Sequence, residues 1–202
     1  MTKLEKIIDH YLTQCWPEVE KEIEWFTEPE SFDDQIDLAC SSMLRSGRKN
    51  MHQASIPPAS LISCAGAIKK VKSDLEKCKN FDELHDLIAS TISNVQPKKP
   101  RRIGHLTIYD IALRIGWNLK KSPDVVYLHA GTQIGAKALI PKLTGPTLNI
   151  EGLPSAFKKL TPSQAEDVLC RYADDFANPR PFNAAESLGG CGKKRLRRKG
   201  RC

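Results

Sequence analysis

The stretch from residue 106 to residue 119 reads LTIYDIALRIGWNL, and its apolar side chains recur at intervals of three and four residues. That spacing gathers them on one face of an α-helix, whereas a half-buried strand would alternate at every second residue. The sequence therefore predicts a helix here with one buried side. The side chains expected to face inward are Ile108, Ile111, Ala112, Ile115 and Leu119.

The same spacing extends outward in both directions along the chain. Helices are expected from Leu4 to Cys15, after Pro17, after Ser31, over about 59–79 and over about 80–94. A short helical element is expected between residues 123 and 131, another at 134–140, and a last helix after the capping box formed by Ser163 and Glu166. Residues 147–150 could be extended. With no alternating run and no fixed repeat, the fold class is all-α, an irregular multi-helix globular bundle.

Proline marks the expected boundaries. Residues 96–102 read QPKKPRR, and two prolines among four bases cannot continue a helix. This boundary separates an N-terminal helical region, residues 1–94, from a C-terminal helical region, residues 103–178, unless the two form one continuous domain. After it, Pro179 and Pro181 precede residues 179–202, which are expected to form a disordered, flexible basic tail.

Charge is unevenly distributed along the 202 residues. The chain has 31 Lys and Arg against 24 Asp and Glu, but seven of the bases fall within residues 191–202. The rest of the chain is therefore neutral overall, which excludes a uniformly basic nucleic-acid coat. Residues 1–38 hold eleven acids and three bases. This acidic N-terminal region could dock a basic protein partner.

The composition indicates a protein of the cytoplasm. No span of a membrane is expected, because the longest run without charge, residues 50–68, contains Pro57 and Pro58. The N-terminus lacks the basic start and apolar core of a signal peptide. Seven cysteines without a Cys-x-x-Cys pair predict no metal site, and most are expected to be buried free thiols. No cofactor motif is present, and nothing predicts an oligomeric state.

A first candidate phosphate site lies just before the helix at 106–119. A glycine in the turn before a helix leaves backbone N–H groups facing outward at the positive end of the helix dipole, and nearby arginines add charge-assisted bonds. The alternative is an ordinary helix start with solvated linker arginines. The candidate residues are Arg101, Arg102, Gly104, His105 and Thr107.

This segment, residues 100–118, resembles the hairpin of helix-hairpin-helix DNA-binding proteins. Ile103, Gly104 and Thr107 fit the pattern of that turn, while Arg102 stands where the family has its first glycine. The resemblance implies contact with the phosphates of duplex DNA. More broadly, residues 45–172 resemble bacterial proteins, a likeness that supplies no chemistry.

A second candidate phosphate site is the start of the helix expected near residue 134. Gly131, Thr132 and Lys137 could surround an anion there. The alternative is that Gly131 caps a helix and Gly135 allows close helix packing. Basic residues of the loop after the third helix could extend the binding surface, namely Arg48, Lys49 and His52, beside Arg45.

The main hypothesis is sequence-independent binding of nucleic acid, with duplex DNA favoured, through backbone phosphates. Protein interaction through the acidic region is one alternative. Another is a small enzyme, glycosylase-like or lyase-like, that acts on a nucleic-acid or phosphorylated substrate. Asp110 and Arg114, four residues apart, could equally form a surface ion pair. The catalytic candidates for such an enzyme are Asp110, Tyr109, Arg114 and His129.

Overall fold

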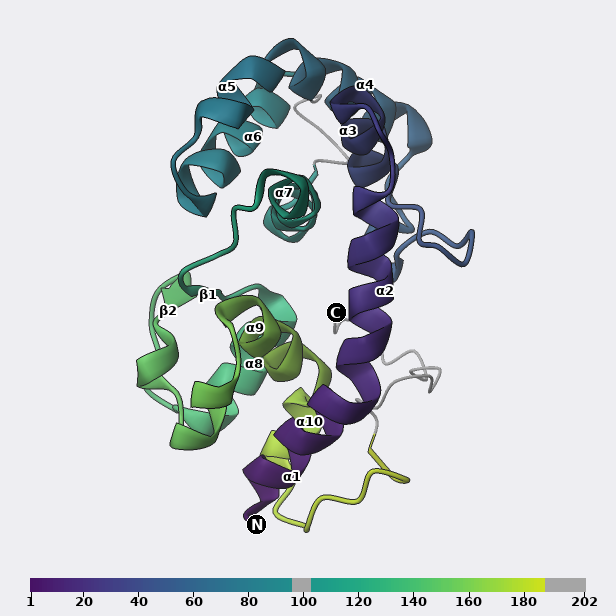
Figure 1. Cartoon of the computed structure of the whole chain (residues 1–202). Helices are drawn as coiled ribbons and strands as arrows, with labels where there is room; N and C mark the ends of the chain where they lie inside the picture. Colours follow the sequence, from purple (N-terminus) through teal and green to yellow (C-terminus); the bar gives the residue numbers. More distant parts are fainter. Residues whose placement is uncertain (96–102, 188–202) are drawn as a thin grey trace. The chain divides into compact units, whose positions relative to one another are not determined.

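The computed structural model describes residues 1–95 and 103–187 (Figure 1). The prediction of an all-α protein is confirmed, since helices dominate these residues and the only sheet among them has two short strands. Arg101 and Arg102, and the basic residues from 193 onward, lie outside the described residues. Residues 179–187 of the expected tail are described, and they pack on the rest of the protein: Ser187 Oγ donates to Asp175 at 2.8 Å.

The chain divides into two compact units, and this division differs from the one expected from the sequence. We call residues 20–123 the middle unit, and residues 1–19 with those from 124 onward the terminal unit. The expected boundary at 94–103 falls inside the middle unit. The reason is that the helices on its two sides pack together: the rings of Phe81 and Tyr109 lie 5.8 Å apart.

The middle unit is built around α7 (His105–Leu119), over which α3 (Phe32–Ser41), α4 (Pro58–Lys70), α5 (Lys72–Lys77) and α6 (Phe81–Val95) arch in Figure 1. Residues 20–27 of helix α2 (Trp16–Thr27) also belong to this unit. The inward face of α7 predicted from residues 108 to 115 is buried, as expected. The helix expected over 59–79 is instead interrupted at Val71, whose ψ of 13° leaves the helical range. Buried side chains from the surrounding helices include Phe26, Ile36, Leu61, Ile68, Leu75, Phe81, Leu84 and Ile88.

The terminal unit combines α1 (Lys3–His10), the π-helical turn η1 (Tyr11–Cys15), α8 (Ala130–Leu139), α9 (Pro162–Arg171) and α10 (Ala173–Ala177). It also holds two 3-10 helices, η3 (Ile150–Gly152) and η4 (Ser155–Lys159). Helices α8 and α9 touch at Gly135, where a Cβ would lie 2.0 Å from the carbonyl oxygen of Leu169. A side chain cannot fit between two backbones at that distance, so Gly135 serves close helix packing.

Two local predictions for the terminal unit are wrong. Residues 126–127 form strand β1 (Val126–Tyr127), paired antiparallel with β2 (Thr147–Leu148), rather than part of a helical element. Consequently α8 begins at Ala130, and Gly131 lies inside its first turn instead of ending a helix. The last long helix, α9, is capped by Thr161 and Gln164 and starts at Pro162, because proline at the first helical position has the required φ.

Two further sequence predictions concern the cysteines and membrane-spanning helices. Cys40 and Cys64 are buried free thiols, as predicted, whereas Cys78 and Cys170 are only half-buried and Cys15 is disulfide-bonded. The expectation of a free thiol is therefore wrong for Cys15. In the part of the chain that the structure describes, no helix has the length and apolar character needed to cross a membrane.

Candidate functional site

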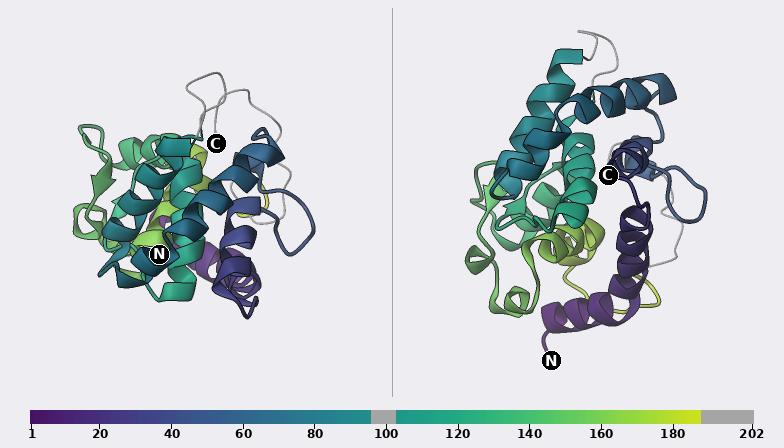
Figure 2. Two further views of the ribbon diagram at one scale, coloured as in Figure 1. Left: turned by 90° about the horizontal axis from the view of Figure 1, so that it is seen from above. Right: turned by 45° about the horizontal axis from the view of Figure 1, so that its top comes forward.

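The basic loop after α3 is a β-hairpin, which the sequence did not predict. Met43 and Lys49 form an antiparallel bridge, and Leu44 N donates to Arg48 O at 2.9 Å. Gly47 N donates to Leu44 O at 2.9 Å, and Gly47 has a φ of +72°. A turn followed by a left-handed residue is a standard three-residue hairpin loop, and glycine adopts that conformation without strain. We call residues 43–49 the basic hairpin; it projects from the helices as the blue loop between α3 and α4 (Figures 1 and 2).

The two arginines of the basic hairpin are available for an external anion. Arg45 and Arg48 are exposed, and neither side chain has an ion-pair or hydrogen-bond partner among the described residues. Lys49 is engaged, because its Nζ donates to the carbonyl oxygen of Ile56 at 2.6 Å. Residues 38–73 contain no Asp or Glu, so the local charge of this segment is positive.

Not every base of that segment is available. On α4, Lys69 Nζ lies 2.5 Å from Asp37 Oδ2 of α3. The next helix contributes Lys72, whose Nζ lies 2.8 Å from Asp33 Oδ1. These pairs neutralise two lysines with acids of the acidic N-terminal region. The exposed bases of this segment without an ion pair among the described residues are Arg45 and Arg48 of the hairpin and Lys70 at the end of α4.

Arg114 of α7 fixes the chain on both sides of the basic hairpin. Its Nη1 donates to the carbonyl oxygen of Ala39, before the hairpin, and to Gln53 Oε1, after it, each at 3.0 Å. The guanidinium carbon lies 4.7 Å from the ring centre of Phe26, and only 4% of Arg114 is exposed. Burial lowers the pKa of Arg114, an effect that nearby Asp110 opposes, but an arginine keeps its charge at any physiological pH.

Asp110 does not form the direct ion pair with Arg114 that its spacing suggested. Instead, Gln53 Nε2 donates to Asp110 Oδ2 at 3.2 Å, while the oxygen of the same amide accepts from Arg114. His52 Nδ1 lies 3.7 Å from the same Asp110 oxygen. Gln53 was not a candidate from the sequence, because a lone glutamine in a polar loop carries no periodic signal; it is nevertheless fully buried.

Helix α2 supports the hairpin from another side. The indole nitrogen of Trp25 donates to the carbonyl oxygen of Met43 at 3.0 Å. The backbone N–H of Arg45 donates to Glu22 Oε2 at 3.3 Å. With Arg114, these contacts hold the base of the hairpin while leaving both arginine side chains exposed.

The start of α7 retains the features expected of an anion site only in part. Gly104 is the N-cap, with an extended backbone and no side-chain capping bond, and both it and His105 are exposed. Thr107 is buried at 4% exposure and does not face solvent. The preceding helix, α6, ends at Val95, so most of the turn that resembles a helix-hairpin-helix lies outside the described residues.

The candidate residues of α8 do not converge on one exposed site. Gly131 and Thr132 are buried in the first turn, whereas Lys137 is exposed in the last turn. Thr132 Oγ1 donates to Glu166 Oε1 of α9 at 2.5 Å, so a carboxylate already lies at the positive end of this helix. A phosphate at this place would meet that negative charge.

The four catalytic candidates have different surroundings. Tyr109 is 1% exposed and lies edge-on to Phe81 of α6. Asp110 and Arg114 belong to the cluster around Gln53, and His129 is the N-cap of α8 in the terminal unit. Within the described residues, no group of three or more His, Cys, Asp or Glu side chains could hold a metal ion.

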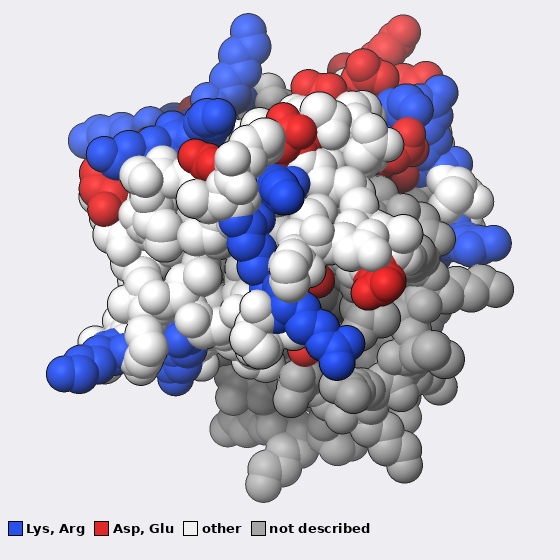
Figure 3. Space-filling model, turned by 90° about the horizontal axis from the view of Figure 1, so that it is seen from below, with Lys and Arg blue, Asp and Glu red and all other residues white. Residues whose placement is uncertain are grey.

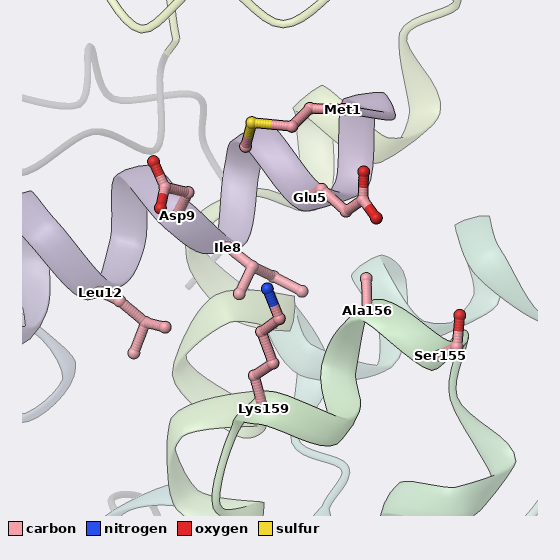
Figure 4. A pocket seen from close by; sticks show the side chains of 8 residues that line it. All are labelled: Met1, Glu5, Ile8, Asp9, Leu12, Ser155, Ala156 and Lys159. Carbon is pink, nitrogen blue, oxygen red and sulfur yellow. The ribbon is translucent and has the colours of Figure 1, made fainter.

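A small hollow of about 150 Å³ lies between α1 and η4 in the terminal unit (Figure 4). The side chain of Lys159 extends toward Ile8 of α1. A backbone hydrogen bond from Thr2 lowers the pKa of Glu5, and Lys159 adds to that effect. None of the residues expected to act on a ligand lines this hollow. Its lining is Met1, Glu5, Ile8, Asp9, Leu12, Ser155, Ala156 and Lys159.

Surface charge is mixed on the face shown in Figure 3, where blue and red side chains are interspersed with uncharged ones. Comparisons with family models, curated proteins and solved structures gave no match. Inference about function therefore rests on the geometry of the side chains, and among the described residues the basic hairpin is the strongest candidate.

Proposed function

We propose that this cytoplasmic protein binds duplex DNA through its backbone phosphates, with the basic hairpin as the main contact. One observation carries the proposal: the hairpin presents two exposed guanidinium groups, Arg45 and Arg48, that have no partner among the described residues, while buried Arg114 binds Ala39 before the hairpin and Gln53 after it. Guanidinium groups bind phosphate oxygens bidentately, and each phosphate they neutralise releases counterions. Fixing the hairpin in advance lowers the entropy lost on binding.

Other predicted contacts would add to this one. The uncapped N–H groups at the start of α7, next to His105, would donate to the oxygens of a second phosphate. Arg101, Arg102 and the bases after residue 190 would contribute further charge. The helix-hairpin-helix resemblance supports the same partner, although its arginines lie outside the described residues. The α8 residues take no part, because Glu166 occupies that helix start.

The enzyme alternative has less support. Its tyrosine, Tyr109, packs on Phe81 rather than beside Asp110. What favours acid–base chemistry is the 3.7 Å approach of His52 Nδ1 to Asp110 Oδ2. That carboxylate also accepts from Gln53, which ties it to the support of the hairpin. We therefore assign Asp110 a positioning role. Because this carboxylate lies beside His52, it also limits the use of His52 as a phosphate contact.

Titration of a fluorescent duplex at several salt concentrations tests the proposal. The wild type is compared with the double variant Arg45→Ala/Arg48→Ala. The salt slope is the slope of log K against log [salt], and its magnitude falls by about 0.9 for each phosphate contact that is lost. The slope of the double variant should therefore be smaller in magnitude by about 1 to 2, and its affinity should be lower by about tenfold or more. Lys142→Ala/Lys158→Ala, which removes two exposed bases of the terminal unit, is the matched control and should change the slope little.

Three outcomes are informative. Equal loss in the two double variants would mean that the hairpin has no special part. An unchanged slope in the hairpin variant would reject the hairpin as the contact. A wild type that does not bind duplex DNA at low salt would reject the proposed function. A version that ends at Ser187 measures the share of the affinity that the last residues supply.

A further inference from the structure

The shape of the hairpin tip bears on where it would sit on a duplex. Between the two arginines stand only Ser46 and Gly47, whose side chains are small. The tip is therefore narrow, and both guanidinium groups can extend from it without a bulky neighbour. The turn also brings the chain segments that carry Arg45 and Arg48 close together, since Leu44 N donates to Arg48 O across it at 2.9 Å.

Two like charges on one short turn repel each other unless several anions surround them. The minor groove of B-DNA, about 6 Å wide, brings the phosphates of both strands near one another. In A-tracts this groove is narrower still, and its stronger negative potential attracts inserted arginines. A pair of adjacent guanidinium groups is complementary to that field.

The amide side chains near the hairpin that could read adenine in the major groove are already engaged. Asparagine and glutamine amides read adenine in the major groove. Here Asn50 Oδ1 accepts from the backbone N–H of His52 at 3.0 Å, and Gln53 is held between Arg114 and Asp110. The tip also carries no aromatic ring that could stack on an unpaired base.

From these observations we propose that the basic hairpin inserts Arg45 and Arg48 into the minor groove of duplex DNA, with preference for A·T-rich sequence. This inference rests on the proposed function and adds the groove and the base composition to it. Arg114 acts as a positioning residue, because it hydrogen-bonds the carbonyl oxygen of Ala39 before the hairpin and the side chain of Gln53 after it.

Base analogues separate the grooves. Three duplexes of about 24 base pairs are compared, with central sites of A·T, G·C and inosine·C pairs. Inosine lacks the guanine amino group, so an inosine·C pair resembles A·T in the minor groove and G·C in the major groove. We expect the wild type to bind the A·T and inosine·C sites at least about fivefold more tightly than the G·C site, since base discrimination is worth about 1–3 kcal/mol per good contact.

Two variants of the full chain complete the experiment. Arg45→Lys/Arg48→Lys keeps both charges but loses the planar guanidinium, so its salt slope should stay and its preference for A·T should fall. Gly47→Ala keeps both arginines but strains the turn at its φ of +72°, and it should also lose the preference. Circular dichroism of each variant checks that the helices are retained.

The possible results are distinct. Equal affinity for the three sites, with Arg45→Ala/Arg48→Ala weakening all of them, would leave phosphate binding intact and overturn groove insertion. Preference for both G·C and inosine·C would place the arginines in the major groove and would likewise overturn it. Failure to bind any of the duplexes would remove the proposed function together with this inference.

Discussion

Nη1 of Arg114 donates a hydrogen bond to Oε1 of Gln53 across 3.0 Å, between residues 61 positions apart in the chain. The same nitrogen also donates to Ala39, while the nitrogen of the Gln53 amide donates to Asp110. Burying a charge is costly unless the charge is hydrogen-bonded. The hydrogen bonds of Arg114, together with its cation–π contact to the ring of Phe26, offset that cost. The arrangement joins α3, the hairpin segment and α7.

Replacing Arg114 by methionine should lower the free energy of unfolding by about 2–4 kcal/mol. Methionine has a similar size, but it leaves the carbonyl oxygen of Ala39 and Oε1 of Gln53 without their donor. Urea denaturation followed by tryptophan fluorescence measures the change. The control, Arg45→Met, alters an exposed arginine and should stay within about 0.5 kcal/mol of the wild type. Equal stability of the two variants would contradict the role given to Arg114.

Two glycine-to-alanine variants should change stability in opposite directions. At Gly135 the new methyl group would lie 2.0 Å from the backbone of α9, and separating the helices should cost about 1–3 kcal/mol. At Gly66, inside α4, nothing lies within 4 Å, so Gly66→Ala should gain about 0.5–1 kcal/mol through helix propensity. Thermal melts of both variants give the comparison. A stable Gly135→Ala variant would be incompatible with the close contact of α8 and α9.

The stability of the terminal unit should fall on acidification through His10. Its Nδ1 lies 2.8 Å from the hydroxyl oxygen of Tyr172, and its ring packs 5.5 Å from the ring of Phe182. Burial lowers the pKa of His10, an effect that Asp175 partly opposes. The unfolded chain, with an ordinary His pKa near 6.5, therefore takes up the proton more readily, so this contribution is present above about pH 6.5 and is lost below it.

His10→Phe removes the titrating group and keeps a ring in its place. Melting temperatures at about pH 7.5 and pH 5.5 should differ less in this variant than in the wild type. The control is His85→Phe, the same change at a histidine outside this cluster. An identical acid sensitivity of wild type and His10→Phe would remove His10 as the cause.

Lys120→Gly should stabilise the end of α7 by about 0.5–1 kcal/mol. Lys120 has a left-handed backbone, with φ 55°, just after the last residue of the helix, and only glycine adopts it without a steric cost. Its exposed side chain contributes no contact that the change would remove. Lys121→Gly, at the next position, should give no gain, because Lys121 has no positive φ and its Nζ donates to Glu76. Chemical denaturation distinguishes the two.

Local pattern was sufficient for much of the fold and for one part of the candidate site. The apolar stripe of 108–115 predicts the buried face of α7, because helical periodicity is local information. The charges of Arg48 and Lys49 were likewise visible as a basic loop. Their hairpin was not, although Gly47 between polar residues was the available signal for a tight turn. The strand at Val126 was missed because two residues are too few to show alternation.

The sequence by itself determined the helical class and the uneven charge, since both follow from residue types and their spacing. Only the tertiary structure decided that α6 and α7 share one unit, that Thr132 faces Glu166, and that Gln53 joins Asp110 to Arg114. Those facts depend on contacts between residues far apart in the chain. A buried hydrogen bond of that kind leaves no periodic trace in the sequence, because it requires only one suitable polar group on each side.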